Sequence, residues 1–193
     1  AFTFPSCTDT QGFPQSVGLT QCGRATSGAG YEWVIRTRTD IYVPWRITSL
    51  PPAWAVGRSV LVGYRDDRCR PQQQMHCCVD DRFAIIPRQA QEAYLTGYGE
   101  DFCRRPASVK SPECKLGWTL RERRVHSLDI RHLMNMSDVR VVRRGCEDTA
   151  LKWLHAWDRA PLELTAEHVL NLSNREGITR GRRLSQMNRP NLS

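Results

Sequence analysis

The chain has 193 residues, 40 % of them hydrophobic and 25 % charged, which is typical of a globular protein long enough to bury a core in one domain. No apolar run approaches the ~20 residues of a membrane-spanning helix, and the first ten residues lack the basic start and apolar stretch of a signal peptide. The net charge of +8 suggests an anionic partner but does not identify it.

The cysteines and the glycosylation sequons favour a secretory compartment, either the Golgi lumen or the exterior. Eight cysteines are many for a cytosolic protein of this size, and sequons begin at Asn135, Asn171 and Asn191. Eight cysteines can pair in 105 ways, so the disulfides are not assigned. We expect the adjacent Cys77 and Cys78 each to bond elsewhere, because bonding each other would strain the chain.

The first third of the chain predicts one helix and two strands. Residues 1–16 are rich in Pro, Gly and Thr and are expected to be irregular, and near-helical spacing begins at Val17. The turn-forming "TSGAG" then leads into an apolar strand at Trp33. "SVLVGY" (59–64) is a second predicted strand, followed by a polar loop.

The middle third predicts two strands that alternate with two helices. A strand over 83–86 runs into a helix opened by Pro87, carrying Tyr94 and ended by "GYG". Ser111 and Pro112 are suited to begin the next helix, and a strand over 125–130 follows. A further strand is expected over 138–144 and a helix over 147–157.

This alternation favours an α/β fold with a mostly parallel sheet flanked by helices. We expect residues 1–160 to form this domain and residues 161–193 to form a C-terminal helix and a loose basic tail.

Two arginines and an aspartate follow the strand at Trp33. Arg36, Arg38 and Asp40 lie on one side of an extended segment, because side chains alternate along a strand. In open α/β sheets ligands bind at the carboxyl ends of strands, where arginines can fork onto phosphate and a carboxylate can hold a divalent ion. The alternative interpretation is a structural ion pair that orients a loop.

Three more carboxylates are candidates for a site. Asp80 and Asp81 precede a predicted strand and could bind an acceptor hydroxyl, bind a metal or act as a base, although aspartates there are also common in turns. Glu113 opens a predicted helix, where it also favours the helix dipole. The group of Cys69, His76, Cys77 and Cys78 lacks a zinc-site spacing, so we interpret it as disulfides or buried thiols.

Three stretches, taken in order, resemble a known family. "YEWVIRTRTDIYVP", "VDDRFAIIPRQAQEAYL" and "SPECKLGWTLRERRVHSLDI" are similar to the second half of a group of nucleotide-diphospho-sugar glycosyltransferases, related in pattern to bacterial lipopolysaccharide-synthesis transferases of the WavE type. In that group a strand ends in Arg-x-Arg-x-Asp, Asp-Asp-x-Phe-Ala leads into a helix with a tyrosine, and a Pro-Glu helix follows. The similarity covers roughly residues 17 to 130.

The resemblance implies a GT-A-like fold, a nucleoside-diphosphate-sugar donor, a hydroxyl acceptor such as a glycan, and a divalent ion, Mn²⁺ or Mg²⁺. Asp40 matches the donor or metal carboxylate, and Arg36 and Arg38 match positions beside the diphosphate. Asp80, Asp81 and Glu113 match the acceptor side, with Asp81 as the first candidate for a catalytic base. About thirty residues precede Trp33, so we expect much of the family's nucleotide-binding first half to be missing. If activity requires that half, we expect this chain to be an inactive fragment.

Two other functions remain open from the sequence. A secreted, disulfide-braced module that binds glycans without catalysis explains the cysteines and sequons but leaves Arg-x-Arg-x-Asp unexplained. Nucleic-acid binding depends on the charge alone and lacks basic residues interleaved with aromatics on one element. The donor sugar, the acceptor and the stereochemistry are not encoded in any motif we identify.

Overall fold

The protein is built around a mixed four-stranded sheet. The computed structural model describes residues 13–38, 41–42, 46–65, 78–104, 109, 111–131, 133, 140–141 and 163–177. The sheet has the order β1-β5-β4-β6 and consists of β1 (Trp33–Thr37), β5 (Phe83–Pro87), β4 (Ser59–Val62) and β6 (His126–Asp129). Two short pairs lie outside it, the antiparallel β2 (Ile41–Tyr42) with β7 (Arg140–Val141) and the parallel β3 (Arg46–Ile47) with β8 (Glu163–Leu164).

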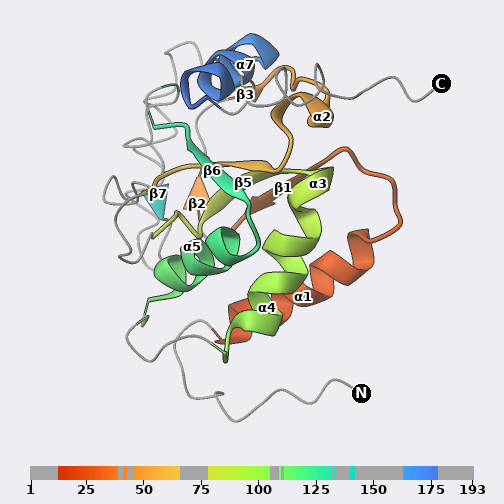
Figure 1. The fold of residues 1–193 in the computed structure, drawn as a ribbon, viewed down its shortest axis with the longest axis vertical. Coiled ribbons are helices and arrows are strands. Elements are labelled where there is room, and N and C mark those ends of the chain that lie inside the picture. Colours follow the sequence, from red (N-terminus) through yellow and green to blue (C-terminus); the bar gives the residue numbers. More distant parts are fainter. Residues whose placement is uncertain are drawn as a thin grey trace, which may run out of the picture.

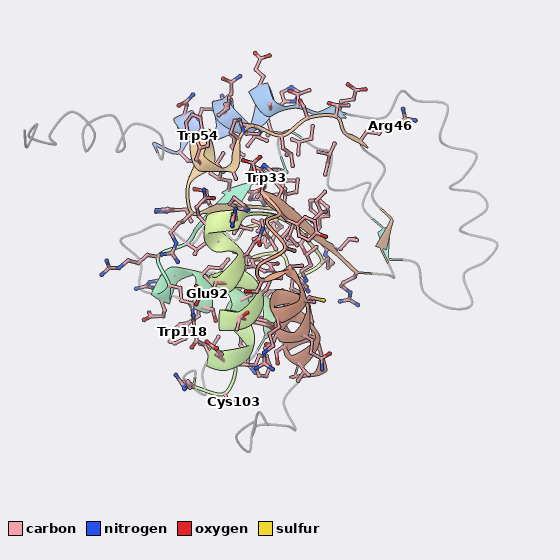
Figure 2. All side chains as sticks on the ribbon, turned by 90° about the vertical axis from the view of Figure 1, so that its right-hand side faces the viewer. Trp33, Arg46, Trp54, Glu92, Cys103 and Trp118 are labelled. Atoms are coloured by element: carbon pink, nitrogen blue, oxygen red, sulfur yellow. A yellow bond between two sulfur atoms is a disulfide. The ribbon has the colours of Figure 1, made fainter. Side chains whose placement is uncertain are left out.

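Helices cover both faces of this sheet (Figure 1). The lower layer in that view contains α1 (Phe13–Thr26), α3 (Arg88–Gln91), the π-helical turn η1 (Glu92–Thr96), α4 (Gly97–Asp101) and α5 (Pro112–Glu122). The upper layer contains α2 (Ala53–Val56) and α7 (Ala166–Arg175). Figure 2 shows Trp54 with the upper layer and Trp118 and Cys103 with the lower layer.

The strands divide their side chains between two apolar clusters, one on each face. Val60 and Val62 of β4 pack with the lower layer, whereas Leu61 between them packs with the upper layer. In β5, Ile86 belongs to the lower cluster and Ile85 to the upper one, and both are fully buried. This alternation follows from the two-residue period of a strand and explains why β4 and β5 are buried throughout and almost wholly apolar.

The predicted strands over 33–35, 59–64, 83–86 and 125–130 are confirmed as β1, β4, β5 and β6. Ser111 caps α5 as expected, since its hydroxyl accepts a hydrogen bond from the Cys114 N–H at 3.2 Å. Helix α1 begins at Phe13, so the expectation of irregular chain up to residue 16 is wrong for residues 13–16. The helix predicted over 147–157 lies outside the described residues.

We had predicted that the glycines of "GYG" end the helix that starts after β5, and this prediction is wrong. The helix continues through α4, and its glycines lie where other parts of the lower layer approach closely. A Cβ on Gly97 would lie 2.5 Å from Arg123 Nε, and a Cβ on Gly99 would meet Thr20 of α1. These glycines permit close packing, which is a different use of a missing side chain from helix termination.

The expected α/β architecture with helices flanking a sheet is confirmed, but strand directions are mixed. β4 and β6 are parallel, whereas β5 is antiparallel to both β1 and β4. A single helix between two strands brings the chain back to the end where the first strand began, so the second strand can run parallel to the first. Between β5 and β6 the chain forms the 88–101 helical run and then α5, and this second helix adds one more reversal of direction.

Candidate functional site

One edge of the central sheet gathers the ends of all four strands. The register places Thr37 at the end of β1 opposite Phe83 at the start of β5, and Val62 at the end of β4 beside both Ala84 and Asp129. Segments 36–38, 64–65, 80–82 and 129–131 therefore meet at this edge, which we call the site edge. It is the carboxyl end of β1, β4 and β6, where ligands bind in open α/β sheets.

Arg36 is a buried cation at the site edge. It is 8 % exposed, and its Nη1 donates a hydrogen bond to Tyr94 Oη at 3.0 Å. Burial alone would lower the pKa of the guanidinium, but the Tyr94 hydroxyl and the Asp81 carboxylate outweigh this and raise that pKa above its usual value. Within the described residues Tyr94 is its only hydrogen-bond partner, so most of its N–H donors are available to an anion.

Arg38 lies beyond Arg36 and is exposed. Its backbone N–H donates to the Arg82 carbonyl at 3.1 Å, which continues the pairing of β1 with β5 past the end of the strand. The Arg38 cation opposes the charge on Arg82, yet the pKa of Arg82 is raised, chiefly by its hydrogen bond to Asp80. Arg38 and Arg82 thus lie opposite each other, where β1 ends and β5 is about to start.

Tyr94 reaches Arg36 from the π-helical turn η1. The tyrosine is fully buried, and its ring lies 5.9 Å from the Arg36 guanidinium carbon. Burial raises the pKa of the phenol above its usual value of 10.0, although the nearby Arg36 cation lowers it in part. Single π-helical turns frequently occur at functional sites, and this one places a polar side chain under the site edge.

We expect stability to fall above pH 10 because of Tyr94. A group whose pKa is higher in the folded than in the unfolded state contributes stability that is complete below the unfolded pKa and is lost as pH rises towards the folded pKa. The loss is about 1.4 kcal/mol per pH unit for one such tyrosine. Urea unfolding at pH 9 and pH 11 measures it. Tyr94→Phe should reduce the difference by about that amount, whereas the exposed control Tyr31→Phe should leave it unchanged; equal pH dependence in both variants would contradict the expectation.

The turn that we call the acidic turn (Val79, Asp80, Asp81, Arg82) precedes β5. Both carboxylates are buried, and each is held by a defined partner. Asp80 Oδ1 accepts hydrogen bonds from the backbone N–H of Arg82 at 2.9 Å and from its Nε at 2.8 Å. Asp81 Oδ2 accepts a hydrogen bond at 2.9 Å from Nε2 of Gln15, in the first turn of α1. Asp80 is therefore part of a structural ion pair. Of the two carboxylates, Asp81 is the one whose charge raises the pKa of Arg36.

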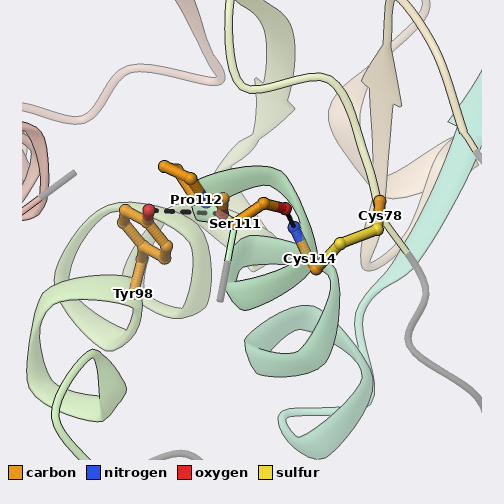
Figure 3. Close-up of a disulfide and its surroundings, with 5 residues drawn as sticks. All are labelled: Cys78, Tyr98, Ser111, Pro112 and Cys114. Atoms are coloured by element: carbon orange, nitrogen blue, oxygen red, sulfur yellow. Dashed lines mark hydrogen bonds between the residues drawn. A yellow bond between two sulfur atoms is a disulfide. The ribbon is translucent and has the colours of Figure 1, made fainter. Parts of the chain in front are cut away.

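Glu113 lies beside the acidic turn, at the start of α5. The Val79 N–H donates to the Glu113 carbonyl at 3.2 Å, and the next residue, Cys114, forms a disulfide with Cys78 (Figure 3). In the described part of the chain the Glu113 carboxylate has no hydrogen-bond or ion-pair partner. The structure thus places Arg36, Arg38, Asp80 and Asp81 at the site edge and Glu113 beside the acidic turn.

A second aspartate–arginine pair at the site edge was not predicted. Asp129 ends β6, and its carboxylate accepts hydrogen bonds from Arg131 Nε at 2.8 Å and from the backbone N–H of Arg65 at 3.1 Å. The Arg131 guanidinium lies 4.7 Å from the centre of the Tyr64 ring. This Asp-x-Arg arrangement repeats that of Asp80 and Arg82, and the repeated spacing at a strand end was the signal that could have found it.

The expected metal ligand Asp40 lies outside the described residues. In the described ranges no group of three or more His, Cys, Asp or Glu side chains is placed to hold a metal ion. Asp80 and Asp81 already bind Arg82 and Gln15, so neither is an uncommitted ligand. Fit to a divalent ion therefore depends on Asp40.

The cysteines of the described region are mostly oxidised. Cys103 is disulfide-bonded as well as Cys78 and Cys114, whereas Cys22 is free and exposed. This is compatible with a lumenal or extracellular setting. Across the described residues, no helix has the length and apolar character needed to cross a membrane.

Comparison with known proteins assigns no family to this fold and site. No family model matches the chain, and neither a curated protein nor a solved structure is significantly similar to it.

Proposed function

We propose that this chain is a glycosyltransferase with a GT-A-like fold that moves a sugar from a nucleoside-diphosphate donor to a hydroxyl acceptor, similar to transferases of the WavE type and acting in the secretory pathway. The observation that carries the proposal is the meeting of Arg36 and Arg38 with Asp81 at the site edge, with Glu113 next to the acidic turn. A buried cation with unused N–H donors next to a second, exposed cation suits a diphosphate.

The roles follow from burial and contacts. Arg36 would donate to the diphosphate, whose leaving charge it would stabilise strongly because the side chain is shielded from water. Asp40, two residues beyond Arg38, would hold a divalent ion that neutralises the same phosphates. Asp81 would accept the proton of the acceptor hydroxyl if the reaction inverts the anomeric centre. Asp80 takes no chemical role, since Arg82 occupies its carboxylate.

The proposal is tested by thermal shift with Mn²⁺ and a panel of nucleoside diphosphates. A ligand at a hundredfold its dissociation constant adds about 2.7 kcal/mol, or roughly 5 to 10 °C for a chain of this size. We expect such a metal-dependent shift with one nucleotide, and its loss in Arg36→Gln and Asp40→Asn. The matched control is Arg58→Gln, an exposed arginine just before β4 at the other end of the sheet, which should keep the shift.

Absence of any shift would contradict donor binding, and a shift that survives both site variants would place the nucleotide elsewhere.

A secreted glycan-binding module is the second candidate. The ion-paired Asp80 and the disulfide beside it favour this candidate, because they stabilise the turn whether or not catalysis occurs. Glycan binding that tolerates Asp40→Asn and Asp81→Asn would support the module.

A further inference from the structure

The acidic turn is attached to α5 by one covalent bond and few backbone hydrogen bonds. The Cys78–Cys114 disulfide joins the residue before the turn to the first turn of α5 (Figure 3). Besides it, the Val79 N–H donates to the Glu113 carbonyl at 3.2 Å and the Asp80 N–H to the Tyr64 carbonyl at 2.7 Å. The turn has further non-covalent contacts, because Gln15 donates to the Asp81 carboxylate at 2.9 Å and Val79 is buried in the lower apolar cluster. The disulfide is the covalent attachment among them.

The start of α5 has its own supports that do not involve the disulfide. The Ser111 hydroxyl caps the helix, and Tyr98 Oη donates to the Pro112 carbonyl at 3.3 Å (Figure 3). Leu116 and Leu120 of α5 are buried in the lower apolar cluster, whereas Cys78 and Cys114 are both partly exposed and belong to neither cluster. Loss of the disulfide should therefore leave α5 and the sheet in place.

We infer that the Cys78–Cys114 disulfide is a redox-sensitive latch on the acidic turn, so that reduction loosens the turn that carries Asp80 and Asp81 without unfolding the domain. A dithiol attacks one sulfur to form a mixed disulfide, and its second thiol then displaces the remaining protein thiolate. The products are two protein thiols and one oxidised dithiol. An effect of reduction on donor or acceptor binding rests on the proposed transferase function. The latch itself does not rest on that function.

Hydrogen exchange of the full chain, followed by mass spectrometry, tests the latch without any ligand. We compare the oxidised chain, the chain treated with dithiothreitol, the oxidised double variant Cys78→Ser/Cys114→Ser, and the control Cys22→Ser, which removes a free exposed thiol. Peptides covering residues 79–82 should exchange at least about tenfold faster in the second and third samples only, while β4, β5 and α5 keep their protection.

Three results would overturn the latch. Unchanged exchange of residues 79–82 in the double variant would mean that the backbone hydrogen bonds suffice. Loss of protection throughout β5 and α5 would mean that the disulfide holds the whole fold. Faster exchange with dithiothreitol but not in the double variant would assign the effect to the other disulfide, at Cys103.

Discussion

Replacing Gly99 by alanine is expected to lower the free energy of unfolding by about 3 kcal/mol, because α1 leaves no room for a methyl group. A Cβ at this position would meet Thr20 Oγ1 and lie 3.0 Å from the Ser16 carbonyl oxygen. Thr20 is buried and its hydroxyl donates to that same carbonyl, so neither atom can retreat. Alanine normally stabilises a helix relative to glycine by up to about 1 kcal/mol, so the clash must exceed that gain.

The matched control is Gly18→Ala, in the same helix pair. A Cβ on Gly18 of α1 would have nothing within 4 Å, and this variant should be neutral or stabilising. Urea unfolding of the two variants measures the difference. Equal stability of both would show that α1 and α4 do not approach as closely as the structure indicates.

Ile85→Ala is expected to cost about 2–5 kcal/mol through a cavity in the upper cluster, or roughly 5–15 °C in Tm. Ile85 is fully buried in the central strand β5. Its cross-strand partner Ile35 on the edge strand β1 provides the control, since it is the same residue type in register on the same face but 49 % exposed.

Ile35→Ala should cost less than about 1 kcal/mol. Differential scanning calorimetry of the two variants gives the comparison directly. Similar losses of stability in the two variants would mean that the upper layer buries β1 as well as β5. The assignment of β1 as the outermost strand of the sheet would then be wrong.

Much of the fold could be predicted because local signals agreed with the tertiary structure. Short apolar runs predicted all four central strands, and Ser111 followed by Pro112 marked the start of α5. Strand direction could not be predicted, since it depends on how many helices separate two strands and on which strands become neighbours. Gly97 and Gly99 were misinterpreted because a glycine that ends a helix and one that admits a neighbouring helix look the same in sequence.

The positions of the candidate residues at strand ends could be predicted from the sequence, but their contacts could not. Arg36 and Asp81 were chosen from their positions at strand ends, and both lie at the site edge. Gln15 could not be foreseen as the partner of Asp81, because 66 residues separate them. The position of Tyr94 against Arg36 depends on a π-helical turn, for which the sequence contains no recognisable signal.

The site edge also has a consequence for how the protein folds. Its strands pair across long stretches of chain: Trp33 of β1 lies opposite Pro87 of β5, and Ser59 of β4 lies beside His126 of β6. Closing such loops costs entropy before any pairing compensates for it, which slows folding in proteins of high contact order. The helices of the lower layer can form from local contacts, whereas the edge that unites Arg36, Asp81 and Asp129 exists only after strands far apart in the sequence have met. Binding at that edge would therefore report assembly of the central sheet, and a nascent chain that ends before β6 would lack the edge.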